Sequence, residues 1–292
     1  MKNFSPAAIS AAGFFFYKTS MMKILEITSA QNPKIKEITA LIEKSKERRS
    51  QKLFIGEGIR EVTACINNGY TIRSVFYNNA IITPEQIEVL FPAKEQIPQC
   101  FSLGSNAYAK IAYRENTEGI VAVVEEKKLQ LHEIKFGKKW EHPLVLIMES
   151  VEKPGNLGAL LRTADACGID AVLVCDPLTD LYNPNLIRSS LGGIFTNQVV
   201  ACSNQEALEW LQHHNINIFT AQLQDSQWYY NTDMVSPTAI VMGTESTGLT
   251  DFWRNVSNAK IKIPMLGELD SLNVSVSAAV LCYEAVRQRC CK

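Results

Sequence analysis

Nearly continuous apolar runs alternate with segments of helical spacing along the second half of the chain. Such runs are typical of strands that are covered on both faces, and the segments between them repeat apolar positions every three or four residues. The runs cover residues 144–148, 171–175, 216–221 and 239–243, and the helical segments cover residues 155–167, 183–191 and 205–213. The alternation predicts an α/β fold class with a parallel sheet and crossover helices.

A smaller α/β unit is predicted before it. Residues 29–52 place Ile35, Ile38 and Leu41 at helical spacing among seven Lys and Arg residues, which predicts one basic amphipathic helix. Strand patterns follow at 53–57, 71–77 and 119–126, with helical patterns at 58–67, from Thr83-Pro84 onward and near 105–112. A chain of 292 residues is long enough for two such units, each with a core of its own.

Charge is distributed unevenly, although the net charge is only −1. Residues 1–60 hold eleven Lys/Arg and five Asp/Glu, whereas residues 140–292 hold nine Lys/Arg and sixteen Asp/Glu. The basic end is the natural place for contact with a polyanion. A solvated charged helix explains the same composition, and charge alone leaves these two interpretations about even.

The composition, with 46% apolar and 20% charged residues, is that of a soluble globular protein. None of the eight cysteines forms a C-x-x-C pair, and several lie in apolar runs, so we expect reduced thiols in a cytoplasmic protein and no metal site. The apolar run at 11–17 is too short to span a membrane. We expect residues 1–28 to be a dispensable extension, with translation able to start at Met21 or Met22; a signal peptide is the weaker alternative.

Ligands bind beyond the carboxyl ends of the strands in parallel α/β sheets. Three segments that directly follow predicted strands are rich in Gly, Pro, Ser and Asn. They cover residues 149–156, 243–248 and 264–273. Neither G-x-G-x-x-G nor G-x-x-x-x-G-K-[ST] occurs, so neither a dinucleotide fold nor a phosphate loop is supported. The four histidines lie outside these loops, which argues against a hydrolase with a catalytic histidine.

Two charged residues near these loops are candidates for chemistry. Arg162 lies off the apolar stripe of its predicted helix, where it could pair with Asp165 at the surface or hold a phosphate and stabilise a developing alkoxide. Glu245 follows Gly243 in a turn where the backbone can approach a ligand and the carboxylate could bond a hydroxyl or amine. An ordinary helix-entry turn is the alternative for Glu245.

The stretch 263–287 joins a polar loop to a helix that is apolar on two sides. The two sides are Val274, Ala278, Leu281 and Ala285, and Val276, Val280 and Tyr283. A helix of this kind is normally buried between layers, and Ser271 and Asn273 are residue types that cap helix starts. The preceding polar loop is costly to bury unless its backbone groups have partners, which a ligand can supply.

Three segments, in order, resemble the three signature motifs of the SpoU family of RNA 2′-O-ribose methyltransferases. The family's Asn, Gly and Arg of the first motif match Asn156, Gly158 and Arg162. Its second motif, G-x-E-x-x-G-L, matches Gly243, Glu245, Gly248 and Leu249. Its third motif matches Ile263, Pro264 and Met265, followed by Ser271, Leu272, Asn273, Val274 and Ser275.

The resemblance implies S-adenosylmethionine as the methyl donor, held by a parallel α/β domain with a deep trefoil knot. It places cofactor contacts at Gly243, Gly248, Ile263, Met265 and Leu272. The positions that match the family's catalytic group are Asn156, Arg162, Glu245, Ser271 and Asn273. A guanidinium stays protonated in proteins, so we expect Arg162 to hold phosphate and stabilise the alkoxide rather than to act as a base.

The resemblance also implies partners and boundaries. Residues 29–126, including the phrase FIGEGIREV at 54–62, resemble the family's RNA substrate-binding domain, residues 127–142 are a predicted linker, and 143–292 are the methyltransferase domain. The family works as a homodimer in which the first-motif Arg helps to complete the partner's site. Ribosomal RNA is the favoured substrate by analogy; transfer RNA and a non-catalytic RNA-binding role are the alternatives.

Overall fold

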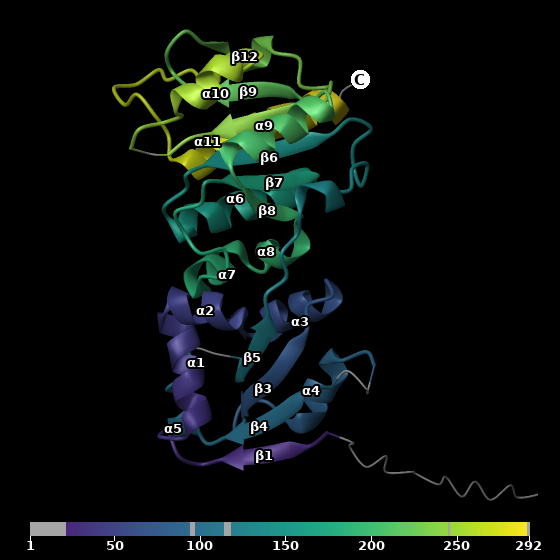
Figure 1. Ribbon diagram of the computed structural model, residues 1–292, viewed down its shortest axis with the longest axis vertical. Coiled ribbons are helices and arrows are strands. Elements are labelled where there is room, and N and C mark those ends of the chain that lie inside the picture. Colours follow the sequence, from purple (N-terminus) through teal and green to yellow (C-terminus); the bar gives the residue numbers. More distant parts are fainter. Residues whose placement is uncertain (1–21, 94–96, 114–117, 245, 291–292) are drawn as a thin grey trace, which may run out of the picture.

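Two α/β halves lie end to end in a computed structural model of the chain, and each half is built on its own sheet (Figure 1). The structure describes residues 22–93, 97–113, 118–244 and 246–290. Within these ranges no helix is both long enough and apolar enough to cross a membrane. The expectations for residues 1–21, including a translation start at Met21, lie outside the described residues.

The first half is a five-stranded sheet in the order β1-β4-β3-β5-β2, in which β5 runs antiparallel to β2 and β3. Its apolar residues alternate between two cores: α1 and α5 cover one face, and α3 and α4 cover the other. The elements are β1 (Ile24–Ile27), α1 (Pro33–Glu43), α2 (Ser45–Gln51), β2 (Leu53–Glu57), α3 (Ile59–Asn67), β3 (Ile72–Asn78), α4 (Pro84–Leu90), β4 (Gln99–Leu103), α5 (Ser105–Tyr108) and β5 (Ile120–Glu125).

The second half is a seven-stranded parallel sheet in the order β10-β12-β9-β11-β6-β7-β8. Helices α6, α7, α8 and α11 pack on one face, whereas α9 and α10 pack on the other. The elements are β6 (Leu144–Glu149), α6 (Pro154–Cys167), β7 (Ala171–Cys175), α7 (Pro184–Ser190), α8 (Gly193–Thr196), β8 (Val199–Cys202), α9 (Asn204–His213), β9 (Asn217–Ala221), β10 (Gln227–Trp228), β11 (Thr238–Met242), α10 (Asp251–Val256), β12 (Ala259–Lys262) and α11 (Val274–Cys290). The fold class is therefore the predicted one, and the trefoil knot stays a prediction.

The predicted linker at 127–142 is packed rather than extended through solvent. Leu129, Ile134 and Phe136 pack against the core beneath α9, and a short 3₁₀ turn covers Leu131–Glu133. The backbone of Lys135 exchanges two hydrogen bonds with the Gln198 side chain, at 2.9 and 2.8 Å. The segment therefore belongs mechanically to the second half.

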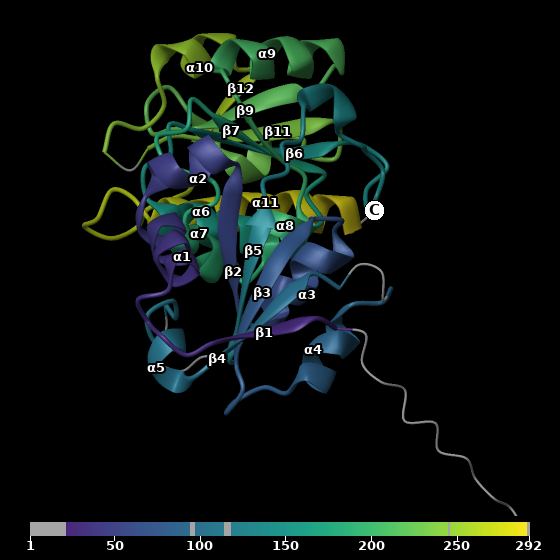
Figure 2. The same cartoon turned by 60° about the horizontal axis from the view of Figure 1, so that its bottom comes forward.

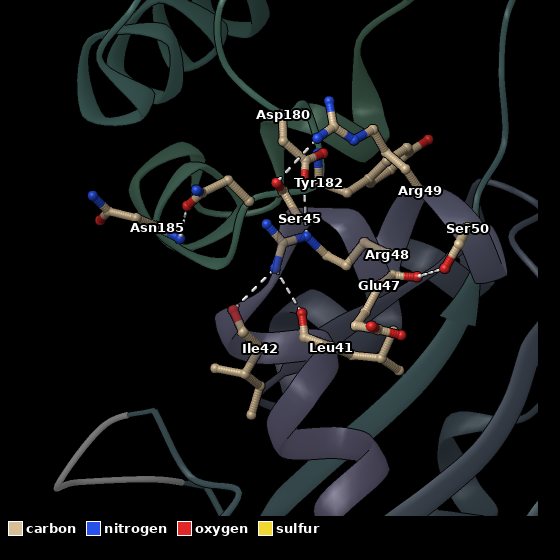
Figure 3. Close-up of polar contacts among 11 residues, drawn as sticks. Leu41, Ile42, Ser45, Glu47, Arg48, Arg49, Ser50, Asp180, Tyr182 and Asn185 are labelled. Atoms are coloured by element: carbon tan, nitrogen blue, oxygen red, sulfur yellow. Dashed lines mark hydrogen bonds and ion pairs between the residues drawn. The ribbon is translucent and has the colours of Figure 1, made fainter.

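The predicted single basic helix is wrong in one respect, because it breaks at Lys44 into α1 and α2. Lys44 has extended backbone angles, φ −116° and ψ 111°. Arg48, predicted on the exposed basic face, is only 4% exposed, and it donates to the carbonyls of Leu41 and Ile42 at 2.6 and 2.9 Å (Figure 3). These carbonyls lie in the last turn of α1, so Arg48 stabilises the corner between the two helices.

An aromatic cluster joins the two halves. Phe54 of β2 stacks on Tyr182, with ring centroids 4.3 Å apart and 13° between the planes, and lies 5.6 Å from Phe195. The Tyr182 hydroxyl donates to the Lys127 carbonyl at 2.6 Å and accepts from the Lys127 N–H at 3.2 Å. Burial in this cluster raises the pKa of Tyr182 well above its ordinary value. The core is thus continuous from one sheet to the other.

Helix α11 buries one of its two predicted apolar sides. Ala278, Leu281 and Ala285 are almost fully inaccessible, whereas Val276 and Tyr283 are 49% and 52% exposed in the single chain. The expected burial between layers is therefore met on one side only within the described residues of a single chain.

Candidate active site

A cleft of about 610 Å³ opens at the carboxyl ends of β9, β11 and β12. These strands are neighbours in the parallel sheet, so their ends meet at one edge. The loops after them and the first turns of α11 form the walls. The loops at 243–250 and 264–273 lie on the same side of the molecule as α1 and α2, which Figures 1 and 2 both show.

The turn after β11 explains why glycine is required at its start. Thr244 and Gly248 form an antiparallel bridge, with hydrogen bonds of 3.2 and 3.0 Å between their backbones. A Cβ atom on Gly243 would lie 2.2 Å from the carbonyl carbon of Gly248 and 2.4 Å from the nitrogen of Leu249. The chain therefore folds back onto Gly243, and any side chain there would force the wall of the cleft open.

The loop before α11 ends at an asparagine with two roles. The Asn273 Oδ1 atom accepts from the Ser275 N–H at 2.9 Å and from its hydroxyl at 2.6 Å, which caps the helix start. The Asn273 Nδ2 atom donates to Asn156 Oδ1 at 3.4 Å. The residues are 117 positions apart, so this contact joins the first motif to the third. Ser271 does not cap the helix, since its hydroxyl donates to Asp270 at 3.1 Å.

The structure brings most of the predicted site residues together. Those that line the cleft are Gly243, Gly248, Ile263, Met265, Ser271, Leu272 and Asn273. Asn156 lines an adjoining hollow of about 60 Å³, which shares Gly243, Thr244 and Val274 with the cleft. Arg162 is exposed further along α6 and lines neither space, and Glu245 lies outside the described residues.

Helix α6, which carries the first motif, is held by a close crossing with α7. A Cβ atom on Gly158 would lie 1.9 Å from Ser189 Oγ and 2.9 Å from the Ser190 nitrogen. Leu157, Leu160 and Leu161 are fully buried beneath it, as the sequence predicted. Gly158 therefore acts through helix packing, and this fixes where Asn156 stands at the start of α6.

Two buried polar atoms in the wall of the cleft have no hydrogen-bond partner within the described residues: Gln222 Oε1 and Arg254 Nε. Unpaired buried polar groups are costly, so a polar ligand that supplies a donor to Gln222 and an acceptor to Arg254 fits this cleft. An adenosyl amino acid has an amino donor on its base and hydroxyl and carboxylate acceptors. Sequence reasoning missed both residues: Gln222 had only the signal of following a strand, and Arg254 had none.

A buried carboxylate ties the second-motif loop to the sheet. Glu149, at the end of β6, is 1% exposed and accepts from the Thr250 N–H at 2.8 Å and from its hydroxyl at 2.6 Å. Its Oε1 atom also accepts from Asn204 Nδ2 at 3.0 Å, and Asn204 Oδ1 in turn accepts from Trp253 Nε1 at 2.7 Å. Both ends of the 243–250 loop are therefore anchored, one by β11 and the other by Glu149. No group of three or more His, Cys, Asp or Glu residues suited to a metal ion occurs in the described part of the chain.

Comparisons with known proteins agree with this geometry. Residues 143–283 match the model of the SpoU rRNA Methylase family, and residues 32–122 match that of the MRM3-like substrate binding domain. The chain is 28% identical over 260 residues to the 23S rRNA (guanosine(2553)-2′-O)-methyltransferase RlmP of Bacillus subtilis. The aligned residues cover 88% of this chain and 98% of that protein. It is 36% identical over 175 residues to the 23S rRNA (guanosine-2′-O-)-methyltransferase RlmB of Pectobacterium atrosepticum, over 59% of this chain and 72% of that protein.

A solved structure extends the similarity to both halves. The crystal structure of an AdoMet-bound rRNA methyltransferase from Sinorhizobium meliloti superposes with a TM-score of 0.81 at 26% identity, covering 90% of this chain and 98% of that one. This coverage includes most of both halves. With two motifs lining one cleft, the first motif joined to them through Asn156, and relatives matched over most of their length, this chain belongs to the SpoU rRNA methylase family.

Proposed function

We propose that this protein transfers a methyl group from S-adenosylmethionine to the 2′-hydroxyl of a ribose in ribosomal RNA. The observation that carries the proposal is the cleft, in which the second and third motif loops meet beside two unpartnered polar atoms, with Asn156 of the first motif in the adjoining hollow. The named relatives modify 23S rRNA, which favours a ribosomal over a transfer RNA target. A non-catalytic RNA-binding role is disfavoured, because it would not require the cleft or the Asn156–Asn273 contact.

The residues of the cleft divide by what they can bind. S-adenosylmethionine, when bound, supplies an electrophilic methyl group on a sulfonium. Gln222 Oε1 is suited to accept from the adenine amino group, and Arg254 is suited to donate to a hydroxyl or carboxylate. Gly243, Ile263 and Leu272 offer backbone and apolar surface around the rest of the cofactor.

The side chains of the first and third motifs are suited to hold the ribose. Asn156 and Asn273 form one polar pair at the edge of the cleft, and Ser271 lies nearby on the same loop. Their role is to orient the 2′-hydroxyl for in-line attack, since positioning alone can remove much of a barrier. We propose that Arg162 and Glu245 complete this group, Arg162 as a phosphate and alkoxide clamp rather than a base.

A homodimer explains two otherwise isolated features. Val276 and Tyr283 leave an apolar face of α11 exposed, and Leu272 beside the cleft is 41% exposed. Arg162 is exposed on α6, which packs against α11, and does not line the cleft of its own chain. In the proposed dimer, α6 and α11 form the interface and Arg162 reaches the partner's cleft.

We also propose that residues 29–126 form the domain that binds the RNA substrate, and that the protein acts in the cytoplasm.

Calorimetry with S-adenosylmethionine and transfer of its labelled methyl group test the proposal together. We expect saturable cofactor binding and methylation of in vitro transcribed 23S rRNA, but not of total transfer RNA. Asn273→Ala should abolish transfer while the protein stays folded, and Arg162→Lys should lose most of it. Cofactor binding without transfer to any RNA would leave the non-catalytic alternative, and full activity of Arg162→Lys would exclude the two-point clamp.

A further inference from the structure

Exposed cations gather on α1, α2 and the turns that flank α2. These side chains are all exposed, and none forms an ion pair within the described residues. They are Lys36, Lys44, Lys46, Arg49 and Lys52. The acidic residues of these helices, Glu37, Glu43 and Glu47, are fewer. Since free cations in one place neutralise phosphates efficiently, this surface suits an RNA backbone.

Helices α1 and α2 and two of the loops that form the walls of the cleft lie on one side of the molecule. In Figures 1 and 2, α1 and α2 lie on the side of the loops at 243–250 and 264–273, although the two regions belong to different halves. Helix α7 lies between them. Ser189 on α7 contacts Pro154 at the start of α6, with its hydroxyl 3.5 Å from the carbonyl.

A further cation, Arg188 of the second half, lies against Tyr113 of the first half. Arg188 on α7 is exposed, and its guanidinium lies 5.4 Å from the ring centroid of Tyr113, which is 47% exposed. Arg188 also donates to Asn185 at 3.0 Å. An exposed guanidinium above an aromatic ring offers RNA both a phosphate contact and a stacking plane. The Tyr113 N–H donates to the Glu57 carboxylate at 3.2 Å.

The relative position of the halves is fixed by a buried ion pair. The Arg48 Nε atom donates to Asp180 Oδ2 at 2.7 Å, and the two side chains are only 4% and 12% exposed (Figure 3). Arg48 simultaneously holds the last carbonyls of α1, so the pair links the corner of the basic helices to the segment before α7. Together with the stack of Phe54 on Tyr182 and the core that both halves share, this ion pair opposes relative motion of the two halves.

We infer that α1, α2 and Arg188 form one RNA-binding surface that crosses the domain junction, and that Arg48 and Asp180 are positioning residues that hold this surface at a set distance from the cleft. The inference rests on the proposed function and adds to it the kind of substrate. The preferred RNA is an extended one that touches α1–α2 while its target ribose enters the cleft, so a short fragment around the target nucleotide is a poor substrate.

The surface is tested by single substitutions of its cations. Lys46→Ala, Arg49→Ala and Arg188→Ala should each weaken binding of in vitro transcribed 23S rRNA. For contacts to single-stranded segments, each should also lower the slope of log K against log salt concentration by about 0.7. The matched control is Lys138→Ala, which removes an exposed cation from the segment before β6. This segment lies at the amino end of its strand, whereas the cleft lies at the carboxyl ends of the strands. Equal salt slopes for all four variants would overturn the surface.

The positioning role is tested by comparing RNA lengths. Asp180→Ala should lower kcat/KM on the full 23S transcript by tenfold or more, since small misplacements can cost about a hundredfold, while transfer to a fragment too short to reach α1–α2 changes less than twofold. Cofactor affinity should not change, and Asp180→Glu should restore part of the loss. Equal losses on both RNAs, or a wild type that prefers the fragment, would overturn the inference. A wild type that binds no cofactor would instead refute the proposed function.

Discussion

Glu149 offers the sharpest test of how the cleft is held open. It accepts three hydrogen bonds, one from Asn204 and two from Thr250, and it is 1% exposed. We expect its replacement to release the far end of the 243–250 loop while β11 still holds the near end. The loop supplies one wall of the cleft, so stability and cofactor affinity should fall together.

The magnitude follows from the number of donors left without an acceptor. Glu149→Ala strands three donors at about 1–3 kcal/mol each, and entry of water limits the total to about 3–5 kcal/mol. Glu149→Gln keeps the shape and one acceptor oxygen but turns an NH₂ group toward donors, which costs about 2 kcal/mol. With an m-value of about 3 kcal/mol/M, the urea midpoint of the Gln variant should fall by roughly 0.7 M.

Urea unfolding and calorimetry with S-adenosylmethionine measure the two consequences. We expect the Gln variant to bind the cofactor about tenfold more weakly, which corresponds to about 1.4 kcal/mol of the loss appearing at the cleft. Glu209→Gln is the matched control, because Glu209 is exposed on α9 and accepts a hydrogen bond from Gln205 on the same helix. A Glu149→Gln protein with the urea midpoint and cofactor affinity of the control would refute the reasoning.

The other predictions concern glycines and pH. Gly243→Ala should abolish cofactor binding in calorimetry, because its Cβ would collide with backbone, whereas Gly267→Ala on the neighbouring loop, with nothing within 4 Å, should bind normally. Gly158→Ala should lower the melting temperature through its collision with α7. Gly155→Ala, in open space on the same helix, should leave the free energy of unfolding unchanged or raise it by the usual helix propensity of about 0.5–1 kcal/mol. Equal shifts in melting temperature for the two variants would contradict the packing role. The Arg287 side chain lowers the pKa of Glu284 below its ordinary 4.5, so its stabilisation is present above that pH and lost as the pH falls through the lowered value. The urea midpoints of wild type and Glu284→Gln should therefore converge between pH 6 and pH 3, and a constant difference would contradict the assignment.

Strands with strong apolar runs were predictable, and short or mixed ones were not. β6, β7 and β11 are covered on both faces, so all their positions except Glu149 and Thr238 at the strand ends are apolar and the pattern was unambiguous. β1, β4, β8 and β10 were missed. β4 mixes Gln99 and Ser102 into its apolar residues, and β10 has only two residues. β1 is an edge strand with three exposed residues of four, and β8 is a four-residue edge strand, so neither carries a run long enough to stand out.

Local signals also misled where a distant partner decided the outcome. Arg48 has the sequence surroundings of a solvated basic helix, yet its partner Asp180 lies 132 positions away. The backbone turn at Lys44 that brings the two together has no glycine or proline to announce it. Conversely, Val276 and Tyr283 carry the pattern of a buried helix side and are exposed in the single chain.

The sequence by itself determined the α/β class, the strand ends that surround the cleft, and, through three motifs in order, the family. Those features depend on periodicity and on residues close together in the chain, which the sequence displays directly. The tertiary structure decided that Asn156 meets Asn273, that Gln222 and Arg254 face the cleft, and that Glu149 anchors its loop. It also decided that the basic helices are locked against the catalytic half. Each of these depends on which distant groups satisfy buried hydrogen-bonding atoms, and no local pattern specifies that partner.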